Sequence, residues 1–429
     1  MTLGWLQIVR LGLVQMCLGA IVVLTSSTLN RLMVVELALP AILPGLLVGL
    51  HYAIQITRPN WGFLSDTKGQ RTRFIIGGMA MLALGGFSAA LGVVVMETNH
   101  LAGLAISILA YALIGVGVAA SGTSLLALLA TATAPDRRAA AATITWLMMI
   151  AGIAITAGTV GAFLDPYTPA LLLKIVATVT IGAVIVTTLA VWGIEKRVVA
   201  RREPDEMPFW QGFKEVWAER SARIFTLFVF LSMSAYFMQE LILEPYSGLV
   251  FGFTPGQSTS LSGAQHGGVF VGMIVVGIGS SVLRIGALRT WVIAGCLGSA
   301  AALVTITWLG NYGAHLPLTP AVVLMGFFNG MFTVAAISAM MALAGEGRGA
   351  REGTRMGLWG AAQAIAAGFG GLLGAAAADV MRTMIDDAPA FGTVFLTEAI
   401  LFLLSAWMAW RIMDSNRPTT ENAGLVPGE

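Results

Sequence analysis

From Phe74 to Met96 the sequence reads FIIGGMAMLALGGFSAALGVVVM, and after ETNH it continues from Leu101 to Thr131 as LAGLAISILAYALIGVGVAASGTSLLALLAT. Neither run contains Asp, Glu, Lys or Arg. A helix that crosses the bilayer core of roughly 30 Å needs roughly 20 apolar residues. Both runs meet this requirement, and the four polar residues between them suit a short connection. The stretch therefore predicts two consecutive membrane-spanning helices.

The same pattern extends over the whole chain of 429 residues, which is 57% hydrophobic and only 11% charged. So few charges cannot solvate a globular exterior, so lipid is expected to surround most of the protein. Dividing the chain at charges, Pro and Asn predicts about twelve spanning helices. They are Leu11–Leu32, Pro44–Leu64, Phe74–Met96, Leu101–Thr131, Ala139–Phe163, Pro169–Ile194, Ile224–Tyr246, Ser258–Leu283, Thr290–Leu309, Pro320–Ala344, Thr354–Val380 and Phe391–Met413.

The distribution of basic residues predicts the orientation. With both termini in the cytoplasm, all but three of the 24 Lys and Arg fall on the cytoplasmic side, the exceptions being Arg31, Lys174 and Arg382. Cytoplasmic loops of membrane proteins carry such an excess of basic residues. We therefore expect a multi-pass protein of the bacterial inner membrane, cytoplasmic or intracytoplasmic. The net charge of +2 gives no reason to expect nucleic acid as a partner.

An internal repeat divides the helices into two sets of six. An offset of 213 residues aligns Arg138 with Arg351 and Trp146 with Trp359, and the same offset aligns two pairs of glycines. We predict an N-terminal half over residues 1–194, a cytoplasmic linker over 195–223, a C-terminal half over 224–413 and a cytoplasmic tail over 414–429. Two parallel six-helix repeats joined in this way resemble the all-α major facilitator fold.

The loop after the second predicted helix supports this fold. It reads GFLSDTKGQRTR from Gly62 to Arg73 and resembles the major facilitator signature G-x-x-x-D-(R/K)-x-G-(R/K)-(R/K), with Thr67 where a cation is usual. The residues assigned to this loop motif are Gly62, Asp66, Gly69 and Arg71, together with Arg73 two residues further on. Gly69 permits a tight turn, and Asp66 is expected to cap or pair at a neighbouring helix end. We expect this motif to be structural.

Four further stretches carry a closer resemblance. They read LPAILPG from Leu39, HYAIQITRPNWG from His51, QELILEPY from Gln239 and QHGG from Gln265. The chain is similar here to the PucC/LhaA proteins of purple phototrophic bacteria, a branch of the major facilitators implicated in light-harvesting complex assembly and bacteriochlorophyll handling. The resemblance implies bacteriochlorophyll as a non-catalytic ligand. It implies light-harvesting antenna polypeptides as partners, and bacteriochlorophyll synthase as a further partner.

Two histidines lie inside predicted helices, His51 in the second and His266 in the eighth. Ionisable side chains inside the bilayer are costly and often functional. Each imidazole could be an axial ligand of the magnesium in a chlorin. The flat chlorin macrocycle would then pack against the small residues Gly158, Gly161, Gly371 and Gly374. The alternative is a histidine that only hydrogen-bonds a neighbouring helix.

A polar group in the seventh predicted helix gives further pigment-binding candidates. Glu240 and Glu244 are four residues apart and would share one helix face. Carboxylates inside the membrane are expected to have a cationic partner or to be neutral. The pair could form a proton-coupled site, bind a substituent of a macrocycle, or simply lie together at the end of the helix. Gln239 beside them and Gln55 near His51 complete the set of candidates.

Three function classes compete on this sequence. The first is an assembly factor that holds pigment, and the second is a secondary transporter of a small solute or pigment precursor. The third is an accessory or catalytic chain of bacteriochlorophyll synthase. Membrane prenyl transferases bind diphosphate through Mg²⁺ with paired acids, whereas Asp66 and Asp136 stand alone here. We therefore expect no enzymatic activity, and Cys17 and Cys296 indicate no metal site.

Overall fold

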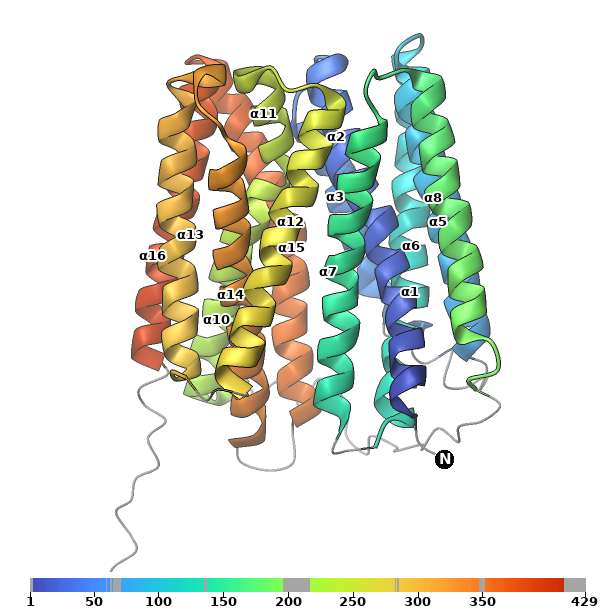
Figure 1. Cartoon of the computed structure of the whole chain (residues 1–429), viewed down its shortest axis with the longest axis vertical. Coiled ribbons are helices and arrows are strands. Elements are labelled where there is room, and N and C mark those ends of the chain that lie inside the picture. Colours follow the sequence, from blue (N-terminus) through green and yellow to red (C-terminus); the bar gives the residue numbers. More distant parts are fainter. Residues whose placement is uncertain are drawn as a thin grey trace, which may run out of the picture.

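The computed structural model describes residues 3–58, 60, 61, 64, 71–134, 137–195, 217–281, 283, 285–346 and 352–412, and each element in these ranges is helical. The helices form one bundle with nearly parallel axes (Figure 1). The first half contains α1 Trp5–Val23, η1 Leu24–Thr28, α2 Leu29–Arg31, η2 Leu32–Glu36, α3 Ile42–Ile54, η3 Gln55–Thr57, α5 Arg71–Met96, α6 His100–Ala132, α7 Arg138–Phe163 and α8 Pro169–Val191. The second half contains α10 Arg220–Met238, η5 Gln239–Leu241, α11 Leu243–Phe251, α12 Pro255–Ser281, α13 Leu288–Gly310, η6 Gly313–His315, α14 Thr319–Glu346, α15 Glu352–Arg382 and α16 Asp387–Ile412.

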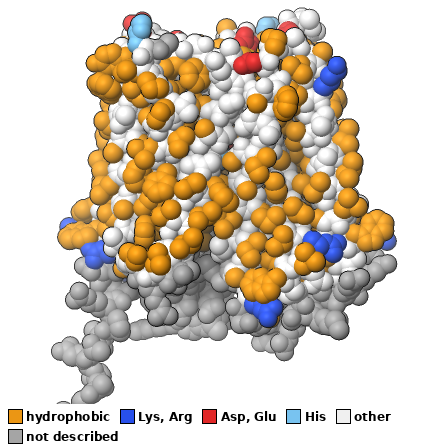
Figure 2. Space-filling view, in the orientation of Figure 1, with side chains coloured by type: hydrophobic (Ala, Val, Ile, Leu, Met, Phe, Trp, Pro, Cys, Tyr) orange, Lys and Arg blue, Asp and Glu red, His pale blue; other side chains and the backbone are white. Residues whose placement is uncertain are grey.

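Within the described ranges, eleven helices are long and apolar enough to cross a membrane, and an apolar helix over Ile42–Thr57 is shorter. They follow the order of the twelve predicted spans, so the prediction of a helical membrane bundle is confirmed. The start of α1 and the end of α16 lie at the same end of the bundle, here called the terminal side (Figure 1). On the face shown in Figure 2, hydrophobic side chains cover the flanks, and most Lys and Arg lie towards that side.

The first membrane helix is longer than predicted and irregular. It extends over Trp5–Glu36, and two of its segments, η1 and η2, are π-helical. Such bulges widen the hydrogen-bonded turn and occur frequently at functional sites. Here η1 carries Ser26 and Ser27 into the interior, where both are buried.

The prediction of one continuous helix over Ile224–Tyr246 is wrong. A 3₁₀ turn, η5, follows α10, and a separate helix, α11, begins at Leu243. Pro245 lies in the first turn of α11, where a missing N–H is tolerated. The left-handed Gly252, with φ of 69°, ends this helix.

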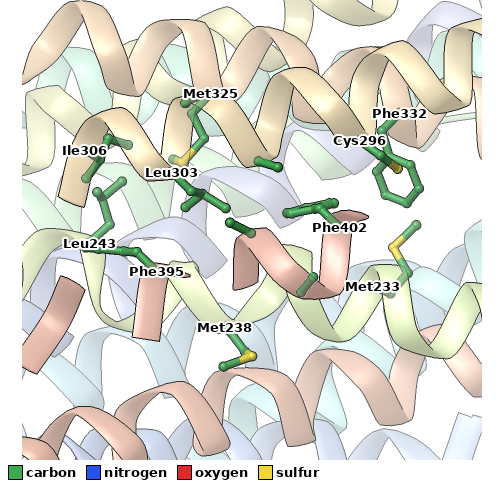
Figure 3. Close-up of a cluster of buried hydrophobic side chains, with 14 of the residues drawn as sticks. Met233, Met238, Leu243, Cys296, Leu303, Ile306, Met325, Phe332, Phe395 and Phe402 are labelled. Carbon is green, nitrogen blue, oxygen red and sulfur yellow. The ribbon is translucent and has the colours of Figure 1, made fainter. Parts of the chain in front are cut away.

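Each half has its own hydrophobic core. In the second half, buried side chains such as Leu303, Phe332 and Phe402 interlock between α10, α13, α14 and α16 (Figure 3). The first half has a separate cluster that runs from Leu3 to Ile194 and also receives Leu241 from η5. Leu241 therefore joins the two halves on the side opposite the termini.

The two halves meet through two equivalent pairs of helices. The second membrane helix, α3, packs on α15, and its counterpart in the second half, α12, packs on α7. Most of the predicted linker, the predicted tail and the loop positions Gly62, Asp66 and Gly69 lie outside the described residues. The predicted halves and their boundaries stay predictions.

Candidate functional site

A cavity of about 340 Å³ lies between the two halves. Helices α1, α3, α6 and α7 of the first half and α10, α12, α14 and α15 of the second contribute its walls. His51 lies nine residues after the start of α3 and His266 eleven residues after the start of α12. At 1.5 Å per residue, both are about 15 Å deep. The cavity therefore reaches the middle of the bundle.

Five of the six predicted pigment-binding residues line this cavity. They are His51, Gln55, Gln239, Glu240 and His266. The sixth, Glu244, does not line it. The remaining wall is largely apolar and includes three methionines, Met149, Met233 and Met273, whose flexible side chains suit a large hydrophobic ligand. An apolar cavity with a few convergent polar groups is the usual form of a small-molecule site.

The protonation pattern of His51 follows from its neighbours on α3. Arg58 donates from Nη2 to Oε1 of Gln55, and arginine can only donate. The amide nitrogen of Gln55 therefore faces His51, with 2.7 Å between the two Nε2 atoms. His51 Nε2 accepts this hydrogen bond, and its ring stacks on Tyr52 with centroids 4.7 Å apart. The lone pair of His51 Nε2 already has a partner.

His266 has the opposite arrangement. Its Nδ1 lies 2.9 Å from the carbonyl oxygen of Ser262, which can only accept, so Nδ1 carries the proton. Nε2 then keeps a lone pair, and it has no hydrogen-bond partner within the described ranges. Histidines that bind metals commonly donate their other N–H to a carbonyl or carboxylate in this way. Of the two predicted ligands, His266 is the one arranged to bind a metal.

The break between α10 and α11 separates the two carboxylates that were expected to form a pair. Glu240 lines the cavity, and Ser26 of η1 lies beside it. Glu244 is buried at the boundary between the halves, where its Oε1 accepts a hydrogen bond from Ser27. The expectation of one shared helix face is wrong, because the helix is interrupted between the two residues.

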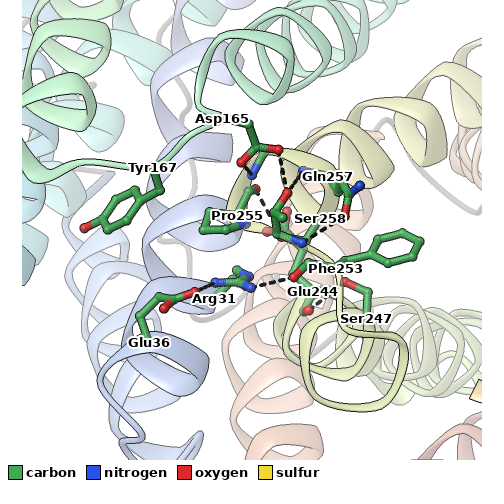
Figure 4. A network of polar contacts seen from close by, with 12 residues as sticks. Arg31, Glu36, Asp165, Tyr167, Glu244, Ser247, Phe253, Pro255, Gln257 and Ser258 are labelled. Carbon is green, nitrogen blue, oxygen red and sulfur yellow. Dashed lines mark hydrogen bonds and ion pairs between the residues drawn. The ribbon is translucent and has the colours of Figure 1, made fainter. Parts of the chain in front are cut away.

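Arg31 was predicted to be an external loop charge, but it is a buried connector between the halves. It is only 2% exposed. Its Nη1 forms an ion pair with Glu36 at 2.5 Å, and its Nη2 donates to the carbonyl oxygen of Phe253 at 2.7 Å. Figure 4 shows this guanidinium between Glu36 and the second half, near Glu244. Phe253 is 222 residues away in the sequence, so no local pattern could have revealed the contact between the halves.

Two aspartates cross the same boundary as helix caps. Asp165, beyond the end of α7, accepts from the backbone N–H of Gly256 at 3.1 Å and from the Thr254 hydroxyl at 2.5 Å, at the start of α12 (Figure 4). Asp379, near the end of α15, accepts from the backbone N–H groups of Ala41 and Ile42 at the start of α3. Carboxylates at helix N-termini satisfy free N–H groups and the helix dipole. The halves are thus fastened on the side opposite the termini.

The four glycines expected to contact a macrocycle lie elsewhere. A side chain added at Gly161 would meet the backbone of Ser260, and one at Gly374 would meet the carbonyl oxygen of Met238. Gly371 similarly faces Leu241 of η5, and the backbone of Gly158 lies against Gly263 of α12, although a side chain added at Gly158 itself would meet nothing within 4 Å. None of the four lines the central cavity. They permit close helix packing.

At the terminal side, the part of the loop motif that is described has a structural role. Arg71 begins α5, and its backbone N–H donates to Glu195 at 2.8 Å. The N–H of Thr72 donates to the other carboxylate oxygen at 3.0 Å. Glu195, the first residue of the predicted linker, therefore caps α5, a contact that the sequence did not indicate. Arg73 is in the first turn of the same helix.

Several polar atoms on the cavity wall have no hydrogen-bond partner among the described residues. They are Gln15 Oε1, Arg58 Nε, Trp146 Nε1 and Gln239 Oε1. Buried polar groups in folded proteins are almost always paired, and unpaired ones often mark a place for water or a ligand. Among the described residues, no group of three His, Cys, Asp or Glu could hold a metal ion by itself. The cavity can supply one imidazole and several hydrogen bonds to a ligand that brings its own metal.

A two-half helical bundle with a cavity at its centre is the arrangement of the major facilitator fold, and solved structures agree. A bacterial homologue of the human lysosomal transporter Spinster, inward-facing and unoccupied, matches with a TM-score of 0.70 at 12% identity, over 96% of this chain and 97% of that one. The nucleoside transporter NupG matches with a TM-score of 0.65 at 16% identity, over 95% of this chain and 98% of that one. These likenesses establish the major facilitator fold.

The family is identified by sequence. The model of the family described as PUCC protein matches residues 28–417, so the chain belongs to the PucC family. A Rhodobacter capsulatus protein named bacteriochlorophyll synthase 44.5 kDa chain is 67% identical, over 95% of this chain and 96% of its own length. Protein PucC of Cereibacter sphaeroides is 30% identical, over 89% of this chain and 84% of its own length. The predicted family resemblance is confirmed.

Proposed function

We propose that this protein is a non-enzymatic assembly factor of the photosynthetic membrane that binds bacteriochlorophyll in its central cavity and passes it to light-harvesting antenna polypeptides. The proposal places it in the inner or intracytoplasmic membrane of a phototrophic bacterium. Membership of the PucC family and the names of its relatives support a role in photosynthesis.

One observation carries the pigment-binding part of the proposal. His266 presents an imidazole nitrogen with a free lone pair, fixed by the hydrogen bond of its Nδ1 to Ser262, on the wall of an apolar cavity at mid-depth. Neutral imidazole is a good axial ligand for magnesium held in a macrocycle. When bound, the pigment would supply the metal, and the protein would supply the ligand nitrogen, an apolar wall and hydrogen bonds.

The test compares two histidines in one cavity. Wild-type protein, His266→Leu and His51→Leu are purified in mild detergent from a phototrophic host, and bacteriochlorophyll per protein is measured by absorption. We expect His266→Leu to lose most of its pigment. His51→Leu should retain more, because its Nε2 is bonded to Gln55. Unchanged pigment in a folded His266→Leu protein would refute axial ligation, and small helical polypeptides should co-purify with the wild type.

Two alternatives stay open. Secondary transport of a small solute or pigment precursor is favoured by the two transporter structures that share this fold. Association with bacteriochlorophyll synthase is favoured by the name of the relative at 67% identity. Uptake of a labelled tetrapyrrole into proteoliposomes that contain the purified protein alone would favour transport. Co-purification of prenyl transferase activity, lost when the partner is washed away, would favour the accessory role.

A further inference from the structure

The polar groups of the central cavity are sorted by depth. Arg58 follows α3 towards the terminal side, about 24 Å from its start, and Trp146 is about 12 Å into α7 from that side. Gln239 and Glu240 follow the last residue of α10, about 28 Å from its start on the terminal side. Hydrogen-bond donors therefore lie near the terminal side, and a carboxylate lies at the opposite end.

The donors near the terminal side are not fully used by the protein. Arg58 gives one hydrogen bond, to Gln55, and its Nε has no partner. The indole N–H of Trp146 also has none. No carboxylate of the described part of the chain forms an ion pair with Arg58. A partly buried guanidinium without an anion is unfavourable, and carboxylates match its donor geometry well.

The cavity volume limits what else the ligand can carry. At about 340 Å³, the cavity is near the lower end of the range of roughly 300–1,000 Å³ for small-molecule sites. A long hydrocarbon tail would add to the volume of the macrocycle and would have to extend beyond the cavity. A tail-free macrocycle is the nearer fit, and its free acid would face Arg58 rather than Glu240, where like charges repel.

We propose that the cavity selects a magnesium tetrapyrrole in its unesterified, carboxylate-bearing form, with the carboxylate at Arg58 and Trp146 and the metal at His266. This inference rests on the proposed pigment binding and specifies the form of the pigment. The protein would then hold the macrocycle before its tail is attached, and an esterification of that carboxylate would come between release from the cavity and insertion into antenna polypeptides.

The experiment compares ligands that differ only at this carboxylate. Purified protein is titrated with a magnesium tetrapyrrole as the free acid, as its methyl ester and as its long-chain ester, and the dissociation constants are measured by absorption. The methyl ester removes the charge without adding a tail. We expect the free acid to bind about tenfold more tightly than the methyl ester, as a charge-assisted contact provides. The long-chain ester should bind no better than the methyl ester.

Two variants locate the selectivity. Arg58→Gln should bring the acid and the methyl ester to equal affinity, whereas His266→Leu should weaken both by the same factor. Equal binding of acid and ester by the wild type, or tighter binding of the long-chain ester, would overturn the selectivity and leave pigment binding intact. If no form binds, the proposed function itself fails. The comparison of ligands on wild-type protein does not depend on the folding of any variant.

Discussion

Asp165 and Asp379 have equivalent positions in the two halves, and each caps a helix of the other half. Asp165 follows α7 and caps α12, while Asp379 lies near the end of α15 and caps α3. The two aspartates are 214 residues apart, one residue more than the offset of 213 that relates the halves. The internal repeat thus extends to a pair of contacts that fasten the halves together.

Replacing either aspartate should weaken the contact between the two halves. Loss of a helix cap costs about 0.5–2 kcal/mol, so Asp165→Ala and Asp379→Ala should each lower the unfolding temperature in detergent, and the double variant should lower it further. Asn311→Ala is the matched control, because this polar residue follows α13 on the same side, is exposed, and has no side-chain contact among the described residues. Equal melting of all variants would show that the caps contribute nothing measurable.

Glu240 and Glu244 should behave differently, contrary to the expectation of a single unit. Glu240→Gln should change ligand affinity with little effect on stability, because the side chain lines the cavity. Ser27→Ala should destabilise the protein by about 1–3 kcal/mol, because it removes the hydrogen bond that Ser27 donates to Oε1 of the buried Glu244. Thermal unfolding and pigment titration of the same preparations separate the two effects. A loss of pigment without destabilisation in Ser27→Ala would contradict the assignment.

Two glycines of α12 provide a steric test of the packing between α12 and α14. A Cβ at Gly272 would overlap the carbonyl oxygen of Phe327 in α14, whereas a Cβ at Gly267 would meet nothing within 4 Å. Gly272→Ala should therefore reduce stability by about 1–3 kcal/mol, and Gly267→Ala should be neutral. Folded yield and unfolding temperature of the two variants give the comparison. Similar values for both would mean that α12 and α14 are not in close contact.

The orientation can be tested with reporter fusions. A fusion after Glu195 should report the cytoplasm and a fusion at Asn99 should report export, because the reverse orientation strands most basic residues outside. A fusion at Tyr167, between α7 and α8, should match the one at Asn99. Export of the fusion at Glu195 would reverse the assignment of sides.

The sequence predicted the helices and most of the cavity for a physical reason. Apolar runs of bilayer length are easily recognised, and polar residues inside them, such as His51, Gln55 and His266, stand out because lipid penalises them. All three line the cavity. The sequence predicted that they lie inside membrane helices, and the structure brings them to one cavity.

Other features depend on contacts between distant residues. The break after α10 could have been suspected from Pro245 and Gly252, which frame a short helix. The burial of Arg31, however, depends on a carbonyl group 222 residues away, and the cap formed by Asp379 depends on an N–H group 338 residues away. Pattern within one helix carries no information about such partners.

The hydrogen bonds between the halves determine how often the two halves can separate. Separating them on the side opposite the termini breaks hydrogen bonds formed by at least five residues, namely Ser27, Asn30, Arg31, Asp165 and Asp379. At a net contribution of about 0.5–1.5 kcal/mol each, the open form would be disfavoured roughly 10²- to 10⁵-fold. Opening would then be a rare event unless a partner that binds the open form better supplies the difference. Such a protein would have a long residence time for its ligand and would release it on the arrival of a recipient, rather than cycle continuously.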